Sequence, residues 1–173
     1  MSKSNQLVLE ISDKLLQDTK NSIKRRIIQK LAAARKLIDF DKEVSAGIYV
    51  YAVEELGKLE VLKNVQDRKL PYWTVFRDHH TKFDKAKEYL KNEKHLECFL
   101  LNEGDFDSNA SDSDDFVTDV AADTEARLGI FYVDLKYNST NRVVTGIKGI
   151  PTVDAKLLSD CIDSLEKIVN NWS

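Results

Sequence analysis

The sequence predicts an all-α protein, a bundle of five or six helices with at most a small irregular or hairpin segment near residues 130–149. Only two prolines and six glycines occur in 173 residues, so long helices can run without interruption. Apolar residues recur with helical spacing in several segments. Residues 48–62 are apolar nearly all the way round a helix, which is typical of the central helix of a bundle.

The first half of the chain predicts three helices. Residues 7–20 begin an amphipathic helix, and residues 27–38 continue with helical spacing as a second. The two could also form one long element. A third helix is expected over about residues 42–66, and it contains the apolar centre of the bundle.

A fourth helix is expected after Pro71, over about residues 72–101, with one charged face in water. Residues 104–116 are rich in aspartate and serine, which predicts an acidic loop. A shorter fifth helix should occupy about residues 119–129. Residues 131–135 fit either a helix or a short strand.

Asparagine, serine, threonine and glycine dominate residues 138–149, which predicts a loop or a small hairpin. Pro151 is expected to open the last helix, with residues 152–154 in its first turn and its end near Trp172. Together the elements predict a single helical domain over residues 1–173.

Composition excludes several classes of protein. Hydrophobic residues make up 42% and charged residues 32%, which is typical of a globular chain and not of a disordered one. No apolar run approaches the roughly 18 residues that a membrane span needs. The first residues contain no signal-peptide hydrophobic region, so we expect a cytoplasmic protein without membrane contact.

Cys98 and Cys161 stand far apart and are expected to be small core hydrophobes in a reducing compartment. With three scattered histidines they do not form the clustered ligand set of a metal site. No phosphate-binding glycine loop, Cys-x-x-Cys pair or nucleophile elbow occurs. We therefore expect neither a metal nor a cofactor.

The net charge of −3 hides an asymmetry. Seven of the 29 acidic residues lie between Glu103 and Asp119 with no basic residue among them, so the rest of the chain has 26 basic and 22 acidic residues. One basic stripe stands out as a candidate for polyanion contact, although such runs usually face water. It comprises Lys20, Lys24, Arg25, Arg26, Lys30, Arg35 and Lys36.

The first candidate site lies inside the predicted central helix. Glu54 and Lys58 are spaced i, i+4 and can pair, while Glu55 falls on an otherwise apolar stripe. A carboxylate there is costly unless it meets a cation or several donors. Gly57 costs about 1 kcal/mol relative to alanine in a helix, which is tolerable where something packs closely against the backbone. The group is either a polar site within the bundle or a structural ion pair.

Two further clusters carry titratable or cationic groups. His79, His80 and Lys82 lie within two helical turns and could perform acid–base chemistry or bind phosphate. The alternative is that the histidines are exposed or N-capping residues of a charged helix. Arg127 and Asp134 bracket an apolar stretch and could either bind phosphate or form a structural bridge.

Three motifs in this order resemble the AbiV family of abortive infection proteins. An Ala-x-Glu-Glu-x-Gly-Lys helix of that family matches residues 52–58, at Ala52, Glu54, Glu55, Gly57 and Lys58. A His-x-x-Lys motif matches His79 and Lys82, which distinguishes His79 from His80. An arginine followed by Tyr-Val-Asp matches Arg127, Tyr132, Val133 and Asp134. The likeness covers about residues 28–172, and residues 1–25 resemble an additional N-terminal helix.

The resemblance implies a HEPN-like helical bundle and a toxin-like antiphage effector that acts on RNA or on translation in the infected bacterial cell. Many HEPN proteins are metal-independent ribonucleases with an Arg-x4–6-His motif, usually completed across a homodimer. Here Tyr132 stands five residues after Arg127 in place of that histidine. The enzyme assignment therefore stays open. His79 would act as acid or base, with Arg127 and Lys82 on phosphate, Tyr132 and Asp134 orienting the site, and Glu55 and Lys58 orienting or charging it.

The expected partners follow from the same resemblance. They are a second copy of the chain in a homodimer, RNA or the translation machinery, and a phage-encoded activator protein. An alternative of a different class is a non-catalytic protein that senses a phage protein or blocks a host process. A third is a helical adaptor in which all three motifs are structural.

Overall fold

The computed structural model describes residues 7–99, 135–138, 143–147 and 153–172. Within these ranges it contains five α-helices and one short 3-10 helix, which confirms the predicted all-α bundle. The α-helices are α1 (Asp13–Leu37), α2 (Lys42–Lys63), α3 (Tyr72–Phe76), α4 (His79–Asn92) and α6 (Ala155–Asn171), and the 3-10 helix η1 is Leu96–Phe99.

Two small antiparallel ladders accompany the helices. Strand β1 (Val8–Glu10) pairs with β2 (Lys69–Pro71), with Leu9 opposite Leu70. Strand β3 (Leu135–Asn138) pairs with β4 (Val143–Ile147). This pairing favours the hairpin over the loop, the two alternatives expected for residues 138–149. The first ladder ties the start of the chain to the segment that follows α2.

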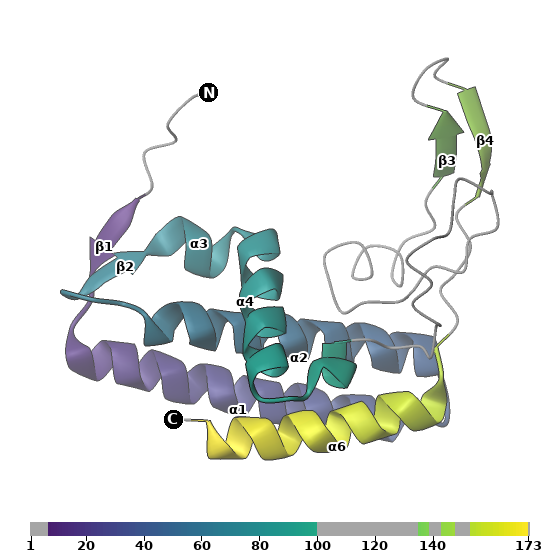
Figure 1. Cartoon of the computed structure of the whole chain (residues 1–173), viewed down its shortest axis with the longest axis horizontal. Coiled ribbons are helices and arrows are strands. Elements are labelled where there is room, and N and C mark those ends of the chain that lie inside the picture. Colours follow the sequence, from purple (N-terminus) through teal and green to yellow (C-terminus); the bar gives the residue numbers. More distant parts are fainter. Residues whose placement is uncertain (1–6, 100–134, 139–142, 148–152, 173) are drawn as a thin grey trace.

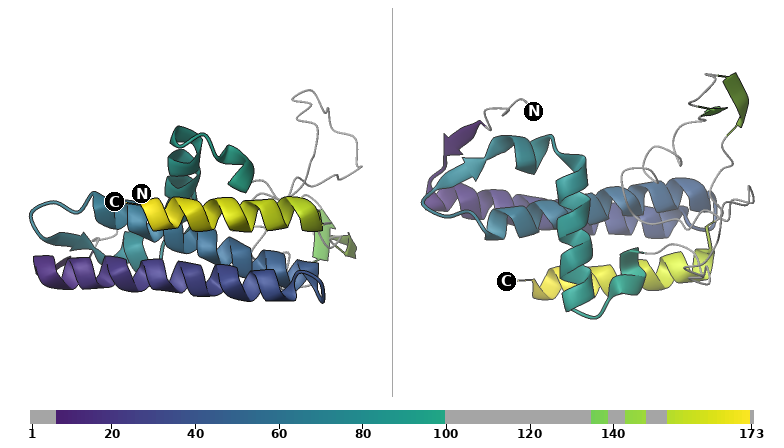
Figure 2. Two further views of the ribbon diagram at one scale, coloured as in Figure 1. Left: turned by 90° about the horizontal axis from the view of Figure 1, so that it is seen from below. Right: turned by 45° about the horizontal axis from the view of Figure 1, so that its top comes forward.

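Three long helices run side by side, and α4 crosses them (Figure 1). Helix α1 packs against both α2 and α6, and α4 packs against α2. The chain reverses between α1 and α2, and α6 runs antiparallel to α1, as the further views make clear (Figure 2). Helix α2 therefore lies between α1 on one side and α4 on another.

An oxygen-bearing N-cap starts each of the four longer described helices. The side chains of Ser12, Asp41, Asp78 and Asp154 each accept a hydrogen bond from a backbone N–H three residues on. Such a cap satisfies one of the backbone donors that the first turn of a helix leaves unpaired.

The two helices expected over residues 7–20 and 27–38 form the single helix α1, the alternative that the sequence left open. The expectation that this helix begins at Leu7 was wrong, because β1 pairs with β2 there and Ser12 caps the helix. The third helix matches its expected range, since α2 starts at Lys42 and ends at Lys63.

The single helix expected over residues 72–101 is also wrong. It is divided into α3, α4 and η1, with breaks at Arg77–Asp78 and after Asn92. The first break arises because Asp78 leaves the helical conformation to cap α4. The last helix begins at Ala155 with Asp154 as its cap, so Asp154 precedes the first turn and does not belong to it. The expectations for residues 104–116, 119–129 and 131–134, and for Pro151 and Thr152, lie outside the described residues.

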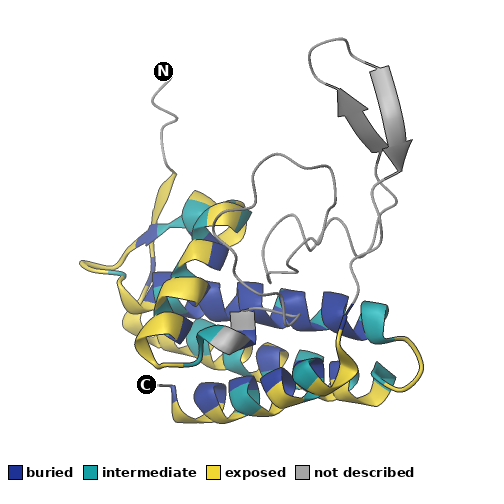
Figure 3. Ribbon diagram, turned by 45° about the vertical axis from the view of Figure 1, so that its right-hand side comes forward, coloured by how far each residue is buried: buried dark blue, intermediate teal, exposed yellow. Residues whose placement is uncertain are grey.

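The core lies between α1, α2, α4 and α6, where buried residues line the facing surfaces (Figure 3). Leu59 and Leu62 of α2 are fully buried, as expected for a central helix. Cys98 and Cys161 are buried and form no disulfide, consistent with the expected core role. Among the helices that the structure describes, none is both long and apolar enough to cross a membrane.

Candidate functional site

The site forms where α4 crosses α2. At the crossing, a Cβ placed on Gly57 would lie 1.8 Å from the carbonyl oxygen of Lys82, well inside van der Waals contact. The backbones of the two helices therefore approach as closely as they do only because residue 57 has no side chain. This is the close packing that a glycine within the central helix predicted.

Glu54 of α2 receives two groups from α4. The Nζ of Lys82 lies 2.6 Å from Oε1 of Glu54, and the Nδ1 of His79 lies 2.8 Å from the same oxygen. Lys82 Nζ and His79 Nδ1 are 3.3 Å apart. The side chains of Glu54 and Lys82 are almost fully buried, whereas 36% of the His79 side chain is exposed. The three residues form a polar cluster that opens to solvent at the imidazole.

The charge state of Glu54 follows from its partners. Burial by itself raises the pKa of this carboxyl group, but hydrogen bonds from Lys82 and His79, together with their charges, outweigh it and hold the pKa below its ordinary value. An ionised carboxylate can only accept, so His79 must donate its Nδ1–H to Glu54. In the neutral ring the lone pair then resides on Nε2. The cluster thus fixes one tautomer of a partly exposed histidine.

The break between α3 and α4 positions His79. Asp78 accepts hydrogen bonds from the Thr81 backbone N–H at 3.0 Å and from the Thr81 hydroxyl at 2.6 Å. The hydrogen bond from the Thr81 side chain is the main cause that holds the pKa of Asp78 below its usual range. His79 is consequently the first residue of α4, at the edge of the crossing. The Asp78–Thr81 spacing is a cap signal that the sequence analysis missed.

Among the described residues, Glu55 and Lys58 pair with each other and form no hydrogen bond or ion pair with that cluster. Lys58 Nζ lies 3.0 Å from Glu55 Oε1, so the expected pairing of Lys58 with Glu54 was wrong. The Glu54 side chain faces α4, where His79 and Lys82 each supply a donor. The Glu55–Lys58 pair instead lines a groove of about 380 Å³. The groove is lined by Leu15, Asp18, Thr19, Ser22, Ile23, Arg26, Glu55, Lys58 and Phe76.

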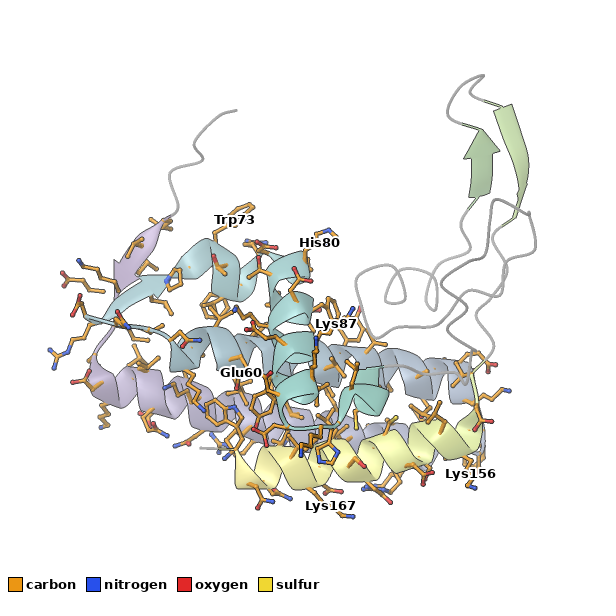
Figure 4. The ribbon with its side chains drawn as sticks, in the orientation of Figure 1. Glu60, Trp73, His80, Lys87, Lys156 and Lys167 are labelled. Atoms are coloured by element: carbon orange, nitrogen blue, oxygen red, sulfur yellow. The ribbon has the colours of Figure 1, made fainter. Side chains whose placement is uncertain are left out.

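Lys82 was expected to hold phosphate, and its position excludes that role. Its side chain is 1% exposed and its ammonium group is already paired with Glu54, so it cannot reach a solvent-borne anion. It can still supply positive charge beside His79. Arg127, Tyr132 and Asp134, the other expected site residues, lie outside the described residues. His80 is exposed, and Figure 4 shows it and Trp73 projecting outward from α4 and α3.

Part of the basic stripe of α1 has structural contacts. Lys24 donates to the Trp172 carbonyl at 2.7 Å, and Lys30 lies over the Tyr51 ring. Arg35 pairs with Asp163 at 2.6 Å, which links α1 to α6. Arg26, by contrast, is exposed and forms an ion pair with no residue in the described part of the chain. The stripe is therefore not a uniform binding face.

The described residues define a helical-bundle protein in which a buried carboxylate, paired with a buried lysine, orients a partly exposed histidine. In the same ranges no group of three or more histidine, cysteine, aspartate or glutamate side chains is arranged to hold a metal ion. Comparison of the chain with family models, curated proteins and solved structures finds no match in any of the three. The likeness to the AbiV family accordingly rests on the three motifs alone.

Proposed function

We propose that this chain is a toxin-like antiphage effector of the AbiV type, which acts on RNA or translation in the infected bacterial cell. One observation carries the proposal: the Nδ1 of His79 lies 2.8 Å from Oε1 of the buried Glu54, while 36% of the His79 side chain is exposed. A carboxylate that fixes the tautomer of an accessible imidazole is the arrangement that acid–base catalysis uses. Two of the three motifs that carry the resemblance meet in this cluster.

In the enzymatic form of the proposal, His79 takes the proton of a ribose 2′-hydroxyl through Nε2. The 2′-oxygen attacks the adjacent phosphorus, and the bond from phosphorus to the 5′-oxygen breaks. The 5′-oxygen takes a proton from water, and a 2′,3′-cyclic phosphate remains. Lys82 contributes positive charge, with its Nζ 3.3 Å from the Nδ1 of His79. Arg127 would hold the phosphate, and Tyr132 and Asp134 would orient the groups, as the resemblance implies.

The second candidate is a non-catalytic protein that senses a phage protein or blocks a host process. The burial of Lys82 and its 2.6 Å contact with Glu54 favour it, because a buried, paired lysine is also what a purely structural bridge requires. Tyr132 in place of the histidine of the Arg-x4–6-His motif favours it as well. In this form the polar motifs fix the packing of α4 on α2.

The assembly that we propose is a two-fold homodimer, the commonest closed symmetry and the one that the resemblance implies. A phage-encoded protein would act as activator. Light scattering on the purified chain should give twice the 19.8 kDa of one copy. A monomer at micromolar concentration would contradict this part of the proposal.

The experiment that tests the function compares His79→Ala with His80→Ala. The two residues are neighbours, but His80 is exposed and projects away from the bundle (Figure 4). Phage plaque formation is measured on bacteria that express each variant, total bacterial RNA is incubated with each purified protein, and thermal melts check folding. The proposal expects protection with the wild type and His80→Ala, and none with folded His79→Ala.

If the wild type cleaves RNA and His79→Ala does not, the enzymatic form is supported. Protection that depends on His79 without RNA cleavage supports the binding form. Equal protection by all three proteins removes His79 from the mechanism. If His79→Ala loses both protection and folding, the His79–Lys82 motif has a structural role.

A further inference from the structure

We propose that strand β1 is a docking edge for an extended strand of a partner protein, which adds to the β1–β2 ladder in the antiparallel direction. In the part of the chain that the structure describes, this ladder has two strands, so β1 has β2 on one side and an open edge on the other (Figure 1). The likeness to the AbiV family begins near residue 28, and β1 lies outside it. The inference therefore goes beyond the proposed function.

Alternate residues of β1 use their backbone groups to bind β2. The Leu7 carbonyl accepts a hydrogen bond from the Tyr72 N–H at 3.1 Å, and the Ile11 N–H donates one to the Arg68 carbonyl at 3.0 Å. In an antiparallel pair, hydrogen-bonded residues alternate with residues whose N–H and C=O groups point away from the partner strand. The backbone groups of Leu7, Leu9 and Ile11 therefore face β2.

The backbone groups of Val8 and Glu10 consequently point to the open edge of β1. Among the described residues, neither forms a backbone hydrogen bond outside the ladder. The opposite edge of the sheet is closed to a new strand. Pro71 has no N–H to donate, and the Lys69 N–H already donates to the Gln66 carbonyl at 2.9 Å. A partner strand can thus add beside β1 and not beside β2.

Three consecutive apolar side chains are exposed on the open edge. Leu7, Val8 and Leu9 are exposed to 54%, 51% and 38%. Proteins usually protect an edge strand with charge, proline or a covering element, because an exposed apolar edge pairs with other chains. In an antiparallel addition Leu9 belongs to a non-hydrogen-bonded pair, in which opposite side chains lie closest. The edge therefore fits a strand that presents apolar residues to these three positions.

Glu10 gives the partner strand a charge preference. Its side chain is exposed and forms no ion pair within the described ranges. On the occupied side of β1, β2 places Lys69 opposite Glu10 and Leu70 opposite Leu9. Opposite charges directly across a ladder are stabilising, and like charges are destabilising. A complementary strand on the open side repeats the pattern of β2, with lysine or arginine opposite Glu10 and apolar residues after it.

The test is a titration of the ¹⁵N-labelled full chain, followed by NMR, with the blocked peptide acetyl-Thr-Lys-Leu-Val-Leu-Thr-amide. Its lysine falls opposite Glu10, and its apolar residues fall opposite Leu9, Val8 and Leu7. Binding is expected to shift the amide signals of Val8 and Glu10 and to slow their hydrogen exchange. Exchange of the Leu9 amide should change little, because that N–H already faces β2. The same peptide with N-methylvaline loses the donor to the Val8 carbonyl and should bind about fivefold more weakly.

Three variants of the chain separate strand addition from simple apolar contact. Val8→Pro removes the outward N–H and leaves the hydrogen bonds between β1 and β2, so it should weaken the peptide about fivefold and leave the Tm unchanged. Phe40→Ala is the matched control. It removes a side chain that is 88% exposed in the turn between α1 and α2, and it should leave the Kd unchanged. Glu10→Gln should remove the preference for this peptide over one with glutamate in place of lysine.

Several outcomes overturn the proposal. Absence of shifts in β1 at millimolar peptide is one, and equal weakening by Val8→Pro and Phe40→Ala is another. Equal binding of the N-methylated peptide also overturns it, because the contact is then apolar without strand addition. If Val8→Pro disturbs β1 itself, this peptide comparison decides.

A second copy of the chain is the other possible occupant of the edge. Dilution of the free chain would then move the Val8 and Glu10 signals, and Val8→Pro would convert a dimer into a monomer in light scattering. That result would replace the partner protein by a second copy. None of these measurements involves His79, and His79→Ala should bind the peptide as the wild type does. A failure of peptide binding with intact His79-dependent phage protection removes the docking edge and leaves the proposed function standing.

Discussion

The backbone of Lys82 rests directly on Gly57, so that its carbonyl oxygen would lie 1.8 Å from any Cβ at that position. This contact sets the distance between α4 and α2. It also brings the side chains of α4 within reach of Glu54. Lys82 and His79 contact Glu54, which lies about one helical turn before Gly57 in α2. The glycine and the buried cluster are two parts of one helix crossing.

Gly57→Ala should destabilise the protein, because α4 must move away from α2 to admit the methyl group. Overpacking costs about 1–3 kcal/mol, and the higher helix propensity of alanine offsets up to about 1 kcal/mol of it. We expect a net loss of about 1–2 kcal/mol, measured by urea denaturation. A variant that is more stable than the wild type would contradict the close approach of the two helices.

Glu54→Gln should cost about 3–5 kcal/mol, since it leaves the ammonium group of Lys82 buried without its counter-ion. For a chain of this size the Tm should fall by roughly 6–20 °C, at about 2–4 °C for each kcal/mol. The double variant Glu54→Gln/Lys82→Met should recover much of that loss, because methionine removes the unpaired charge and fills similar volume. If the double variant is as unstable as Glu54→Gln, the unpaired charge is not the cause.

The stability that Glu54 contributes should depend on pH. Its pKa is lower in the folded protein than in the unfolded chain, because its hydrogen bonds and ion pairs outweigh burial. The unfolded state therefore binds the proton first, and stability falls as the pH falls from the unfolded value of about 4.3 through the folded value. Melts of the wild type and Glu54→Gln from pH 7 to pH 3 should show a Tm difference that is complete above about pH 5 and shrinks below it. A difference that grows with acid would reverse the assigned direction.

Arg35→Ala serves as a contrast at the protein surface. Arg35 contacts Asp163 at 2.6 Å and Glu166 at 2.8 Å, but its side chain is 41% exposed. Exposed ion pairs contribute about 0–1 kcal/mol and weaken with salt. The variant should therefore lose no more than about 1 kcal/mol, a loss that 0.5 M salt reduces, whereas Glu54→Gln should be nearly insensitive to salt. A large, salt-independent loss at Arg35 would show that the α1–α6 contact is not an ordinary surface pair.

The sequence alone was sufficient to predict that the fold is helical and which helix lies at its centre. Residues 48–62 are apolar nearly all the way round the helix, and a segment of this kind needs neighbours on several sides. Helix α2 has such neighbours, because it packs against α1, α4 and α6. The same pattern identified Glu54, Glu55 and Lys58 as polar groups that needed partners, and Gly57 as a point of close packing. These are local properties of one segment, and they do not depend on which helix packs against it.

Only the tertiary structure decided which carboxylate meets which cation. Glu54 and Glu55 are about 100° apart around a helix of 3.6 residues per turn, so they face different neighbours. Since α4 covers the side of Glu54, that residue receives His79 and Lys82, while Glu55 pairs with Lys58 in the groove beside α1. Spacing along the chain cannot predict which carboxylate pairs with which cation. The pairing depends on the direction in which α4 crosses α2 after the break at Asp78.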